Sequence, residues 1–246
     1  MELTLFYIPF SPWSLKARFA LAHHGLHPAE REYKPLFDEI PMRVRLRKPR
    51  GRISVPVLLS PDGPFTDSWE ITRYADRVGS GAPLIPAAEQ ARIAEWNEAS
   101  ERLLNAGRAR GMVRVLRTPE AVRESLPAPI RDVEALAGAV GRVGVRVFNR
   151  KYGIRERDLS LHETAMRLEL DNLRKTLSDG RSYVLGEFTY ADVTIALGLQ
   201  VIDPLPETPM APAARRAATD EKLCETYADV LRWRDALHAR HRLLPS

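Results

Sequence analysis

The stretch LTLFYIPFSPWSLKARFALAHHG, residues 3–25, decides the fold of the first part of the chain. Its opening residues, 3–8, are predominantly apolar, which indicates a buried β-strand. After a turn, Ser11 suits the N-cap of a helix and Pro12 suits its first position, where the missing N–H costs no hydrogen bond. Gly25 is expected to end this helix. A strand that leads directly into a helix predicts an α/β domain.

Weaker signals extend this domain to about residue 80. Asp67 and Glu70 form a D-x-x-E capping box, which indicates the start of another helix. The other expected elements are a strand at 29–34, a basic helix at 37–47, a strand at 53–59 and a short strand at 65–66. The predicted order over residues 1–80 is therefore βαβαββα.

A linker rich in Gly and Pro, residues 81–87, precedes a part of the chain in which every long pattern is helical. Thr189 and Asp192 are spaced to cap each other's backbone at a helix start, and Phe188 and Val193 are spaced as a hydrophobic staple. The helices expected in this all-helical domain, residues 88–246, are 88–116, 130–151, 161–177, one from 189 and 221–239, with a proline break at 127–129. Strands first and helices afterwards predict two separate domains.

Composition excludes several classes of function. The 246 residues are 44% hydrophobic and 28% charged, as in an ordinary globular protein. We expect no signal peptide, because the apolar stretch at the N-terminus is short and no basic segment precedes it. No run approaches the length of a membrane span, so we expect a cytoplasmic protein. Cys224 is the only cysteine, which excludes an intrachain disulfide and a cysteine-based metal site. The histidines lack the spacing of metal ligands, so no metal is expected.

A basic run stands out in a chain of net charge +5. It comprises Arg43, Arg45, Arg47, Lys48, Arg50 and Arg52, with no acid between them. Such a run can contact nucleic acid, can attract an anionic small molecule, or can be the solvated end of a helix. Aromatic side chains do not alternate with the cations as they do in proteins that stack single-stranded bases. We therefore expect neither a nucleic-acid partner nor a membrane partner.

Three short segments of the α/β domain each admit a chemical and a structural interpretation. Ser11 either caps the helix or, with the N–H groups of the helix start, stabilises a thiolate brought by a ligand. Pro56 is either an edge-strand proline or follows a cis bond that turns the Val55 backbone toward a bound peptide. Asp67 and Ser68 either only cap a helix or anchor the ammonium and carboxylate of an amino-acid head group.

The order and spacing of these segments resemble the cytosolic glutathione transferase superfamily over essentially the whole chain. The matching pieces are Tyr7-x-x-x-Ser11-Pro12-Trp13-Ser14, then Val55-Pro56-Val57-Leu58, then Asp67-Ser68, and then Thr189 to Asp192. The resemblance implies a thioredoxin-like α/β domain followed by an all-helical domain. It also implies a homodimer and glutathione as co-substrate.

The same resemblance implies a role for each matching residue. Ser11 would activate the glutathione sulfur. The backbone of Val55, beside a cis Pro56, would pair with the cysteinyl unit of glutathione. Asp67 and Ser68 would hold the γ-glutamyl end. The residues expected to contact the second substrate, an apolar electrophile, are Tyr7, Phe10, Trp13, Met112 and Leu116.

Two departures limit what the resemblance implies. Redox-active relatives carry cysteine at the position of Ser11 or Ser14, and this chain has serine at both. An apparent insertion at 49–52 leaves Arg50 and Arg52 as the candidates to meet the glycyl carboxylate. We therefore predict a transferase that activates the glutathione thiol. The alternative is a non-catalytic module of the same fold that binds another protein.

Overall fold

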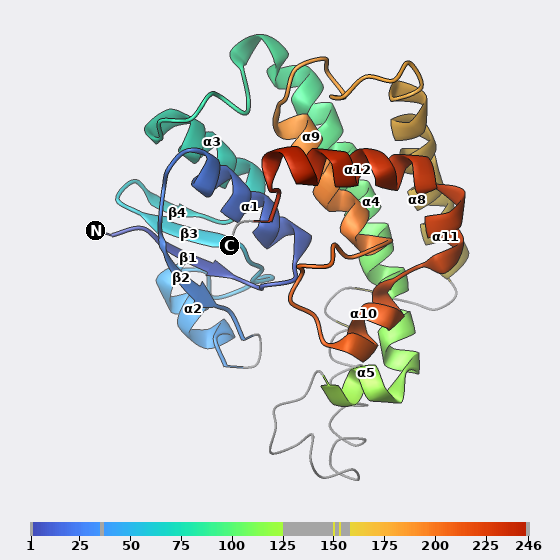
Figure 1. The fold of residues 1–246 in the computed structure, drawn as a ribbon. Coiled ribbons are helices and arrows are strands. Elements are labelled where there is room, and N and C mark those ends of the chain that lie inside the picture. The colour runs from blue at the N-terminus through green and yellow to red at the C-terminus, as the bar shows by residue number, and fades with distance from the viewer. Residues whose placement is uncertain (1, 35–36, 125–149, 151–152, 154–157, 245–246) are drawn as a thin grey trace. The chain divides into compact units, whose positions relative to one another are not determined.

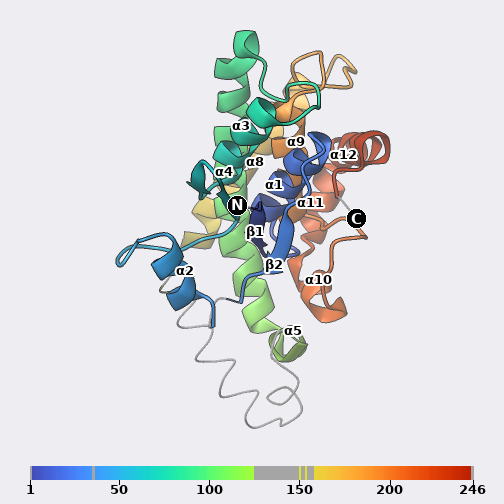
Figure 2. The same ribbon diagram turned by 90° about the vertical axis from the view of Figure 1, so that its left-hand side faces the viewer.

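The computed structural model describes residues 2–34, 37–124, 150, 153 and 158–244, and Figures 1 and 2 show its ribbon in two views. The chain divides into two compact units. The first combines residues 1–97, 185–197 and 237–246, and the second combines 98–184 and 198–236. The predicted domain limits at 1–80 and 88–246 stay predictions.

A four-stranded mixed sheet forms the centre of the first unit. Its strands are β1 (Thr4–Tyr7), β2 (Ala29–Glu32), β3 (Val57–Ser60) and β4 (Gly63–Phe65), in the order β2-β1-β3-β4. β1 is parallel to β2 and antiparallel to β3, and β3 is antiparallel to β4. The helices between the strands are α1 (Pro12–His23), α2 (Glu39–Arg45) and α3 (Ser68–Val78). The order βαβαββα and the thioredoxin-like fold of this part are thus confirmed.

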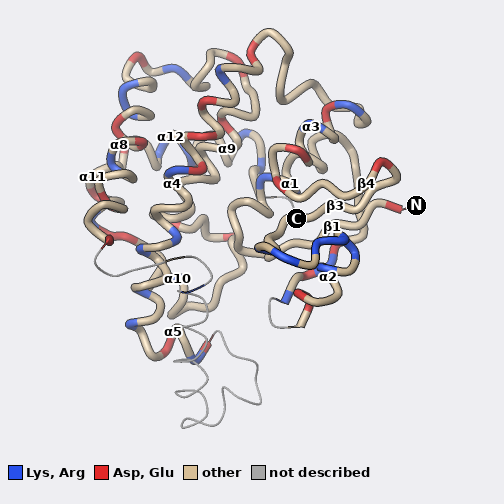
Figure 3. The backbone as a smooth tube through the Cα atoms, turned by 180° about the vertical axis from the view of Figure 1, so that it is seen from behind, with Lys and Arg blue, Asp and Glu red and all other residues tan. Residues whose placement is uncertain are grey.

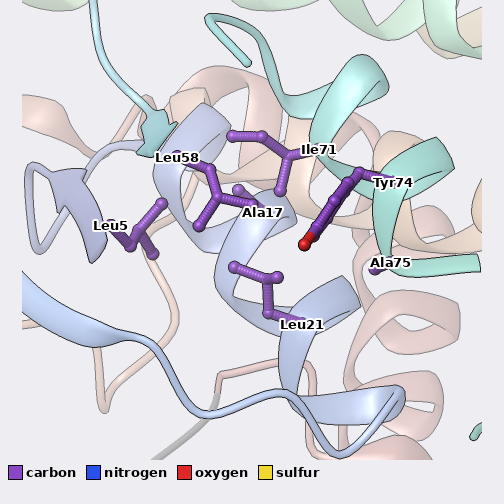
Figure 4. Packing of buried hydrophobic residues seen from close by; sticks show 7 residues of the cluster. All are labelled: Leu5, Ala17, Leu21, Leu58, Ile71, Tyr74 and Ala75. Carbon is purple, nitrogen blue, oxygen red and sulfur yellow. The ribbon is translucent and has the colours of Figure 1, made fainter. Parts of the chain in front are cut away.

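Helices cover both faces of the sheet. Because neighbouring residues of a strand point to opposite sides, each strand contributes side chains to both faces. On one side lie α1 and α3, with a buried cluster of Leu5, Ala17, Leu21, Leu58, Ile71, Tyr74 and Ala75 (Figure 4). On the other side Met42 of α2 joins a cluster of Phe6, Tyr33, Ile53 and Val57. The alternation of Leu5 with Phe6, and of Leu58 with Val57, therefore builds two cores around one sheet.

The start of α9 (Tyr190–Gly198) confirms the predicted capping pair. The Thr189 N–H donates to Asp192 Oδ2 at 2.9 Å, and the Ala191 N–H donates to Thr189 Oγ1 at 3.3 Å. Thr189 and Asp192 are both buried. The Phe188 ring stacks on His241 with centroids 3.7 Å apart and meets Phe19 edge-on at 6.2 Å. Phe188 thus packs on aromatic rings from other segments of the first unit.

The elements described from residue 87 to the end of the chain are helical, as predicted. α4 (Gln90–Arg117) follows a short 3-10 turn, η1 (Ala87–Glu89), and the other elements are α5 (Pro119–Glu124), α8 (Leu159–Thr176), η3 (Leu199–Val201), α10 (Pro212–Ala218), α11 (Glu221–Thr226) and α12 (Ala228–His241). The break at 127–129 lies outside the described residues, as does the helix expected at 130–151 apart from residue 150. Among the described helices, none is both long and apolar enough to cross a bilayer.

The single helix expected at 221–239 is wrong, because the structure divides it into α11 and α12 at Tyr227. The Tyr227 hydroxyl donates to Asp171 of α8 at 2.8 Å, and the Arg174 guanidinium lies over the Tyr227 ring at 4.4 Å. Arg174 also donates to the Thr226 carbonyl. That bond satisfies an oxygen at the end of α11, so contacts with another helix compensate for the interruption.

Asp76 of α3 holds the segment that follows α3 against α1. Its carboxylate lies 2.6 Å from His24 Nε2 and accepts the Leu84 and Ile85 N–H groups at 2.9 and 2.8 Å. A Cβ on Gly79 would lie 2.3 Å from the His24 Cβ, so only glycine allows this close approach. His24 is 1% exposed, and burial lowers its pKa although the hydrogen bond to Asp76 acts in the opposite direction.

This arrangement predicts a pH-dependent contribution to stability. A His24 pKa below that of the unfolded chain means that the folded protein takes up the proton less readily. The contribution is therefore fully present above about pH 6.5 and is lost as the pH falls through the lowered pKa. When urea unfolding is measured across this pH range, the free energy of unfolding should fall less steeply with falling pH in His24→Gln than in the wild type. The comparison is repeated in a His241→Gln background, because burial also lowers the pKa of His241. Equal slopes would contradict the assignment to His24.

Candidate functional site

Three loops of the first unit meet at one end of the sheet. The ladder between β1 and β3 ends with Phe6 opposite Val57, and Leu58 of β3 lies opposite Phe65 of β4. The residues after β1, those before β3 and those after β4 therefore leave the sheet at the same end (Figure 1). These loops carry the predicted residues Ser11, Val55, Pro56, Asp67 and Ser68.

Ser11 occupies the N-cap of α1, as predicted, but its side chain makes no capping hydrogen bond. The loop before it is fixed by other groups. The Ser11 N–H donates to the Ile8 carbonyl at 3.0 Å, and the Ile8 N–H donates to the buried Ser14 Oγ at 3.1 Å. Ser14 thus orders the turn, a role that sequence reasoning missed. The Ser11 hydroxyl is not used to cap the helix, so capping does not compete with a bond to a ligand.

The Val55–Pro56 peptide bond is cis, which confirms the prediction for this bond. β3 begins only at Val57, so Val55 and Pro56 lie beyond the last pair of the β1–β3 ladder. Pro56 is buried, and the half-buried Val55 side chain packs on the cluster beneath α2. The packing of these two residues fixes the backbone at the end of the sheet.

Asp67 is the N-cap of α3. Its Oδ1 accepts the N–H groups of Trp69 and Glu70 at 2.7 and 3.2 Å. The Glu70 carboxylate lies 3.7 Å from the Arg73 guanidinium, so it forms an ion pair with a residue one turn further along α3. Ser68 is buried at the first position of α3. The start of α3 therefore places the Ser68 side chain and the positive end of the helix dipole at the same end of the sheet as Ser11, while Asp67 satisfies two of the helix N–H groups.

Tyr7, which is expected near the second substrate, contacts side chains of α1 and β2. The Arg18 guanidinium lies 5.0 Å from the centre of its ring, and Arg18 Nε donates to Glu30 at 2.7 Å. Burial and a hydrogen bond with Glu30 raise the pKa of Tyr7. The phenol is already hydrogen-bonded to Glu30, whereas the Ser11 hydroxyl makes no capping bond.

The other predicted contacts are distributed over both units. Phe10 is 52% exposed and Trp13 is half-buried, and both lie in or next to the loop that carries Ser11. Arg52 is exposed in the segment before β3. Met112 and Leu116 lie on α4 in the second unit, where Met112 packs on the cluster of Ala109 and Val113. Their contact with a substrate at Ser11 stays a prediction.

A cleft of about 310 Å³ lies elsewhere in the first unit. It is lined by Arg73, Asp76, Arg77, Pro83, Ile85, Pro86, Ala87 and Gln90. None of the predicted glutathione ligands belongs to it, and Asp76 is engaged by His24 and two backbone donors. The predicted glutathione ligands thus lie on or near the convergent loops and not at this cleft.

Cys224 is poorly suited to redox chemistry. Its Sγ donates to the Ile202 carbonyl at 3.6 Å, and burial with the nearby carboxylates of Asp203 and Asp220 raises its pKa to about 11. Since the thiolate is the reactive form, this cysteine is almost entirely unreactive at neutral pH.

Comparison with known proteins agrees with this geometry. Residues 10–78 match the family model of the glutathione S-transferase N-terminal domain. This first part of the chain is therefore similar to the N-terminal domain of glutathione S-transferases. The match covers α1, the cis bond and the start of α3, which are the parts that build the convergent loops. No curated protein matches the sequence.

Solved structures show the same fold over nearly the whole chain. A glutathione S-transferase from Methylobacillus flagellatus KT, solved with glutathione bound, is 17% identical, with a TM-score of 0.63 over 99% of this chain and 100% of the other. Glutathione transferase GSTFuA2 from Phanerochaete chrysosporium is 18% identical, with a TM-score of 0.64 over 98% of each chain. A glutathione S-transferase from Rhodospirillum rubrum F11 is 20% identical, with a TM-score of 0.61 over 96% of this chain and 87% of the other.

Proposed function

We propose that this chain is a member of the glutathione S-transferase superfamily that binds glutathione at the convergent loops and ionises its thiol for attack on an apolar electrophile. The observation that carries the proposal is the position of Ser11, at the start of α1 with a hydroxyl that makes no capping bond. A hydroxyl and helix N–H groups at this point favour a thiolate over a thiol. The thiolate then forms a carbon–sulfur bond with the electrophile.

The remaining loops provide a binding set for a small peptide. The backbone at Val55 lies just beyond a strand end, where an extended ligand can add to the sheet. Ser68 at the start of α3 suits the α-carboxylate of the γ-glutamyl unit, and the Asp67 carboxylate suits its ammonium group. Arg52 suits the glycyl carboxylate. Solved relatives that carry glutathione support the choice of ligand.

The first test is the loss of affinity in Ser68→Ala. Removing a hydrogen bond to a charged group costs about 1.5–3 kcal/mol, which corresponds to about a 10- to 100-fold rise in Kd. Calorimetric titration with glutathione measures this directly. Ser80→Ala, an exposed serine beyond the end of α3, serves as the matched control and should bind like the wild type. Equal affinity of Ser68→Ala and Ser80→Ala would place the γ-glutamyl site elsewhere.

A second prediction separates thiol transfer from disulfide exchange. Exchange requires an attacking protein thiolate, whereas Ser11 and Ser14 occupy both motif positions and the pKa of Cys224 is about 11. The wild type should therefore show negligible reduction of glutathionyl mixed disulfides, and Ser11→Cys should gain measurable activity. Efficient reduction by wild type and by Cys224→Ser alike would refute the proposed chemistry.

The alternative function is a non-catalytic module of the same fold that binds another protein. Retention on immobilised glutathione distinguishes the two, since a module that has lost the site has no reason to bind the resin. We also propose a cytoplasmic homodimer, by analogy with the family. Sedimentation equilibrium of the full chain would give the mass of the assembly.

A further inference from the structure

α2 presents apolar side chains to solvent. Ile40 and Val44 lie one turn apart on it and are 76% and 73% exposed, and Phe37 in the preceding turn is 68% exposed. The helix is held to the sheet by its other side, where Met42 is 1% exposed. The three exposed residues therefore form a stripe, here called the α2 stripe, that the described core does not cover.

Cations extend directly from this stripe. Arg45, Arg47, Lys48 and Arg50 are all exposed and follow one another along the end of α2 and the next loop (Figure 3). Arg45 also lies over the Phe6 ring, with its guanidinium 5.4 Å from the ring centre.

The acids of this segment have partners of their own. Glu39 accepts from Arg43 at 2.8 Å, and Asp38 accepts the Lys34 N–H at 2.6 Å. Arg43 donates in addition to the Gly51 carbonyl at 2.9 Å, which fixes the basic loop against the helix. The exposed surface beside the α2 stripe is thus cationic.

We propose that the α2 stripe and the basic loop after it dock the protein reversibly on an anionic phospholipid surface. An apolar stripe beside exposed Lys and Arg is the pattern of segments that lie in the interface of a bilayer. The stripe would enter the boundary between headgroups and acyl chains, while the cations would meet the negative headgroups. This proposal differs from the expectation of no membrane partner, and it requires no spanning helix.

The apolar stripe favours a lipid surface over nucleic acid. Phosphate backbones are met by cations and hydrogen-bond donors, and they offer no partner for Phe37, Ile40 and Val44. The tested side chains are separate from the proposed glutathione site, because the α2 stripe, Arg47 and Lys48 lie outside the convergent loops. Arg50, a candidate for the glycyl carboxylate, is left unchanged.

Sedimentation of the full chain with lipid vesicles tests the proposal. Binding is expected to vesicles of phosphatidylcholine with phosphatidylglycerol, to be negligible with phosphatidylcholine alone, and to fall at high salt. Ile40→Ser combined with Val44→Ser should lower the partition coefficient about 10-fold or more. Arg47→Asn combined with Lys48→Gln should lower it about 30-fold, and Asn suits the positive φ of Arg47.

Matched variants on other helices keep the test specific. Leu161→Ser with Leu168→Ser removes leucines of α8 that are 68% and 67% exposed, and Lys175→Gln with Arg232→Gln removes two exposed cations. Both controls should bind vesicles like the wild type. Equal binding to the two kinds of vesicle, or equal losses in test and control variants, would overturn the proposal. Binding to duplex RNA without binding to vesicles, or loss of a dimer in the α2 variants alone, would overturn it as well.

Discussion

Replacing Ser11 with alanine is expected to lower the rate of glutathione conjugation at pH 7 by about 10- to 100-fold. The hydroxyl is proposed to donate a hydrogen bond to the sulfur anion, and a bond to a charged group contributes about 1.5–3 kcal/mol. Each pKa unit is worth 1.36 kcal/mol. The pKa of the bound thiol should therefore rise by about one to two units, and the population of the thiolate should fall accordingly.

The pH profile distinguishes this role from a structural one. In Ser11→Ala the rising limb of kcat/KM should move to higher pH, so that the deficit narrows as the pH is raised. Glutathione affinity should stay nearly intact, because the other loops hold the peptide. Ser11→Thr, which keeps the hydroxyl, is the matched control and should retain most of the activity. A uniform loss at all pH values, shared by Ser11→Thr, would show that Ser11 acts only by shaping the loop.

The second large effect concerns Asp192, a buried carboxylate at the start of α9. Asp192→Ala should lower the free energy of unfolding by about 3 kcal/mol. About 1 kcal/mol of this is the loss of a helix cap. The remainder, about 2 kcal/mol, arises because the buried Thr189 N–H loses its acceptor.

Urea unfolding of matched variants measures this contribution. Asp192→Asn keeps an oxygen acceptor, so its free energy of unfolding should fall by less than that of Asp192→Ala. Glu225→Ala, an exposed acid on α11, should change the free energy of unfolding by less than about 0.5 kcal/mol. If Asp192→Ala unfolded at the same urea concentration as Glu225→Ala, the buried capping pair would have no measurable role in stability.

The features that sequence alone could predict are those fixed by local backbone chemistry. The starts of three helices were predicted correctly. They are the start of α1 from Ser11 and Pro12, that of α3 from Asp67, and that of α9 from Thr189 and Asp192. Each depends on hydrogen bonds within a few residues, so the composition of a short segment determines it. The short helix α10 carries a similar signal, a proline at its first position, but is only seven residues long.

Features that depend on distant residues were not predictable in the same way. The interruption at Tyr227 follows from Asp171 and Arg174 on another helix, and no pattern around Tyr227 indicates it. The sequence also left open whether the Ser11 hydroxyl caps its helix; the structure shows no capping bond from it, and its role toward a thiolate stays a prediction. The convergence of three loops required the register of the sheet, which depends on pairing between segments about 50 residues apart.

The chemistry of Cys224 makes the protein convenient for covalent labelling. With a pKa of about 11 and a half-buried sulfur, this thiol should react slowly with maleimides and disulfide reagents at neutral pH. A cysteine introduced on an exposed surface would then carry nearly all of an attached fluorophore or spin label. Colorimetric thiol assays of the wild type would likewise report the consumption of glutathione with little background from the protein.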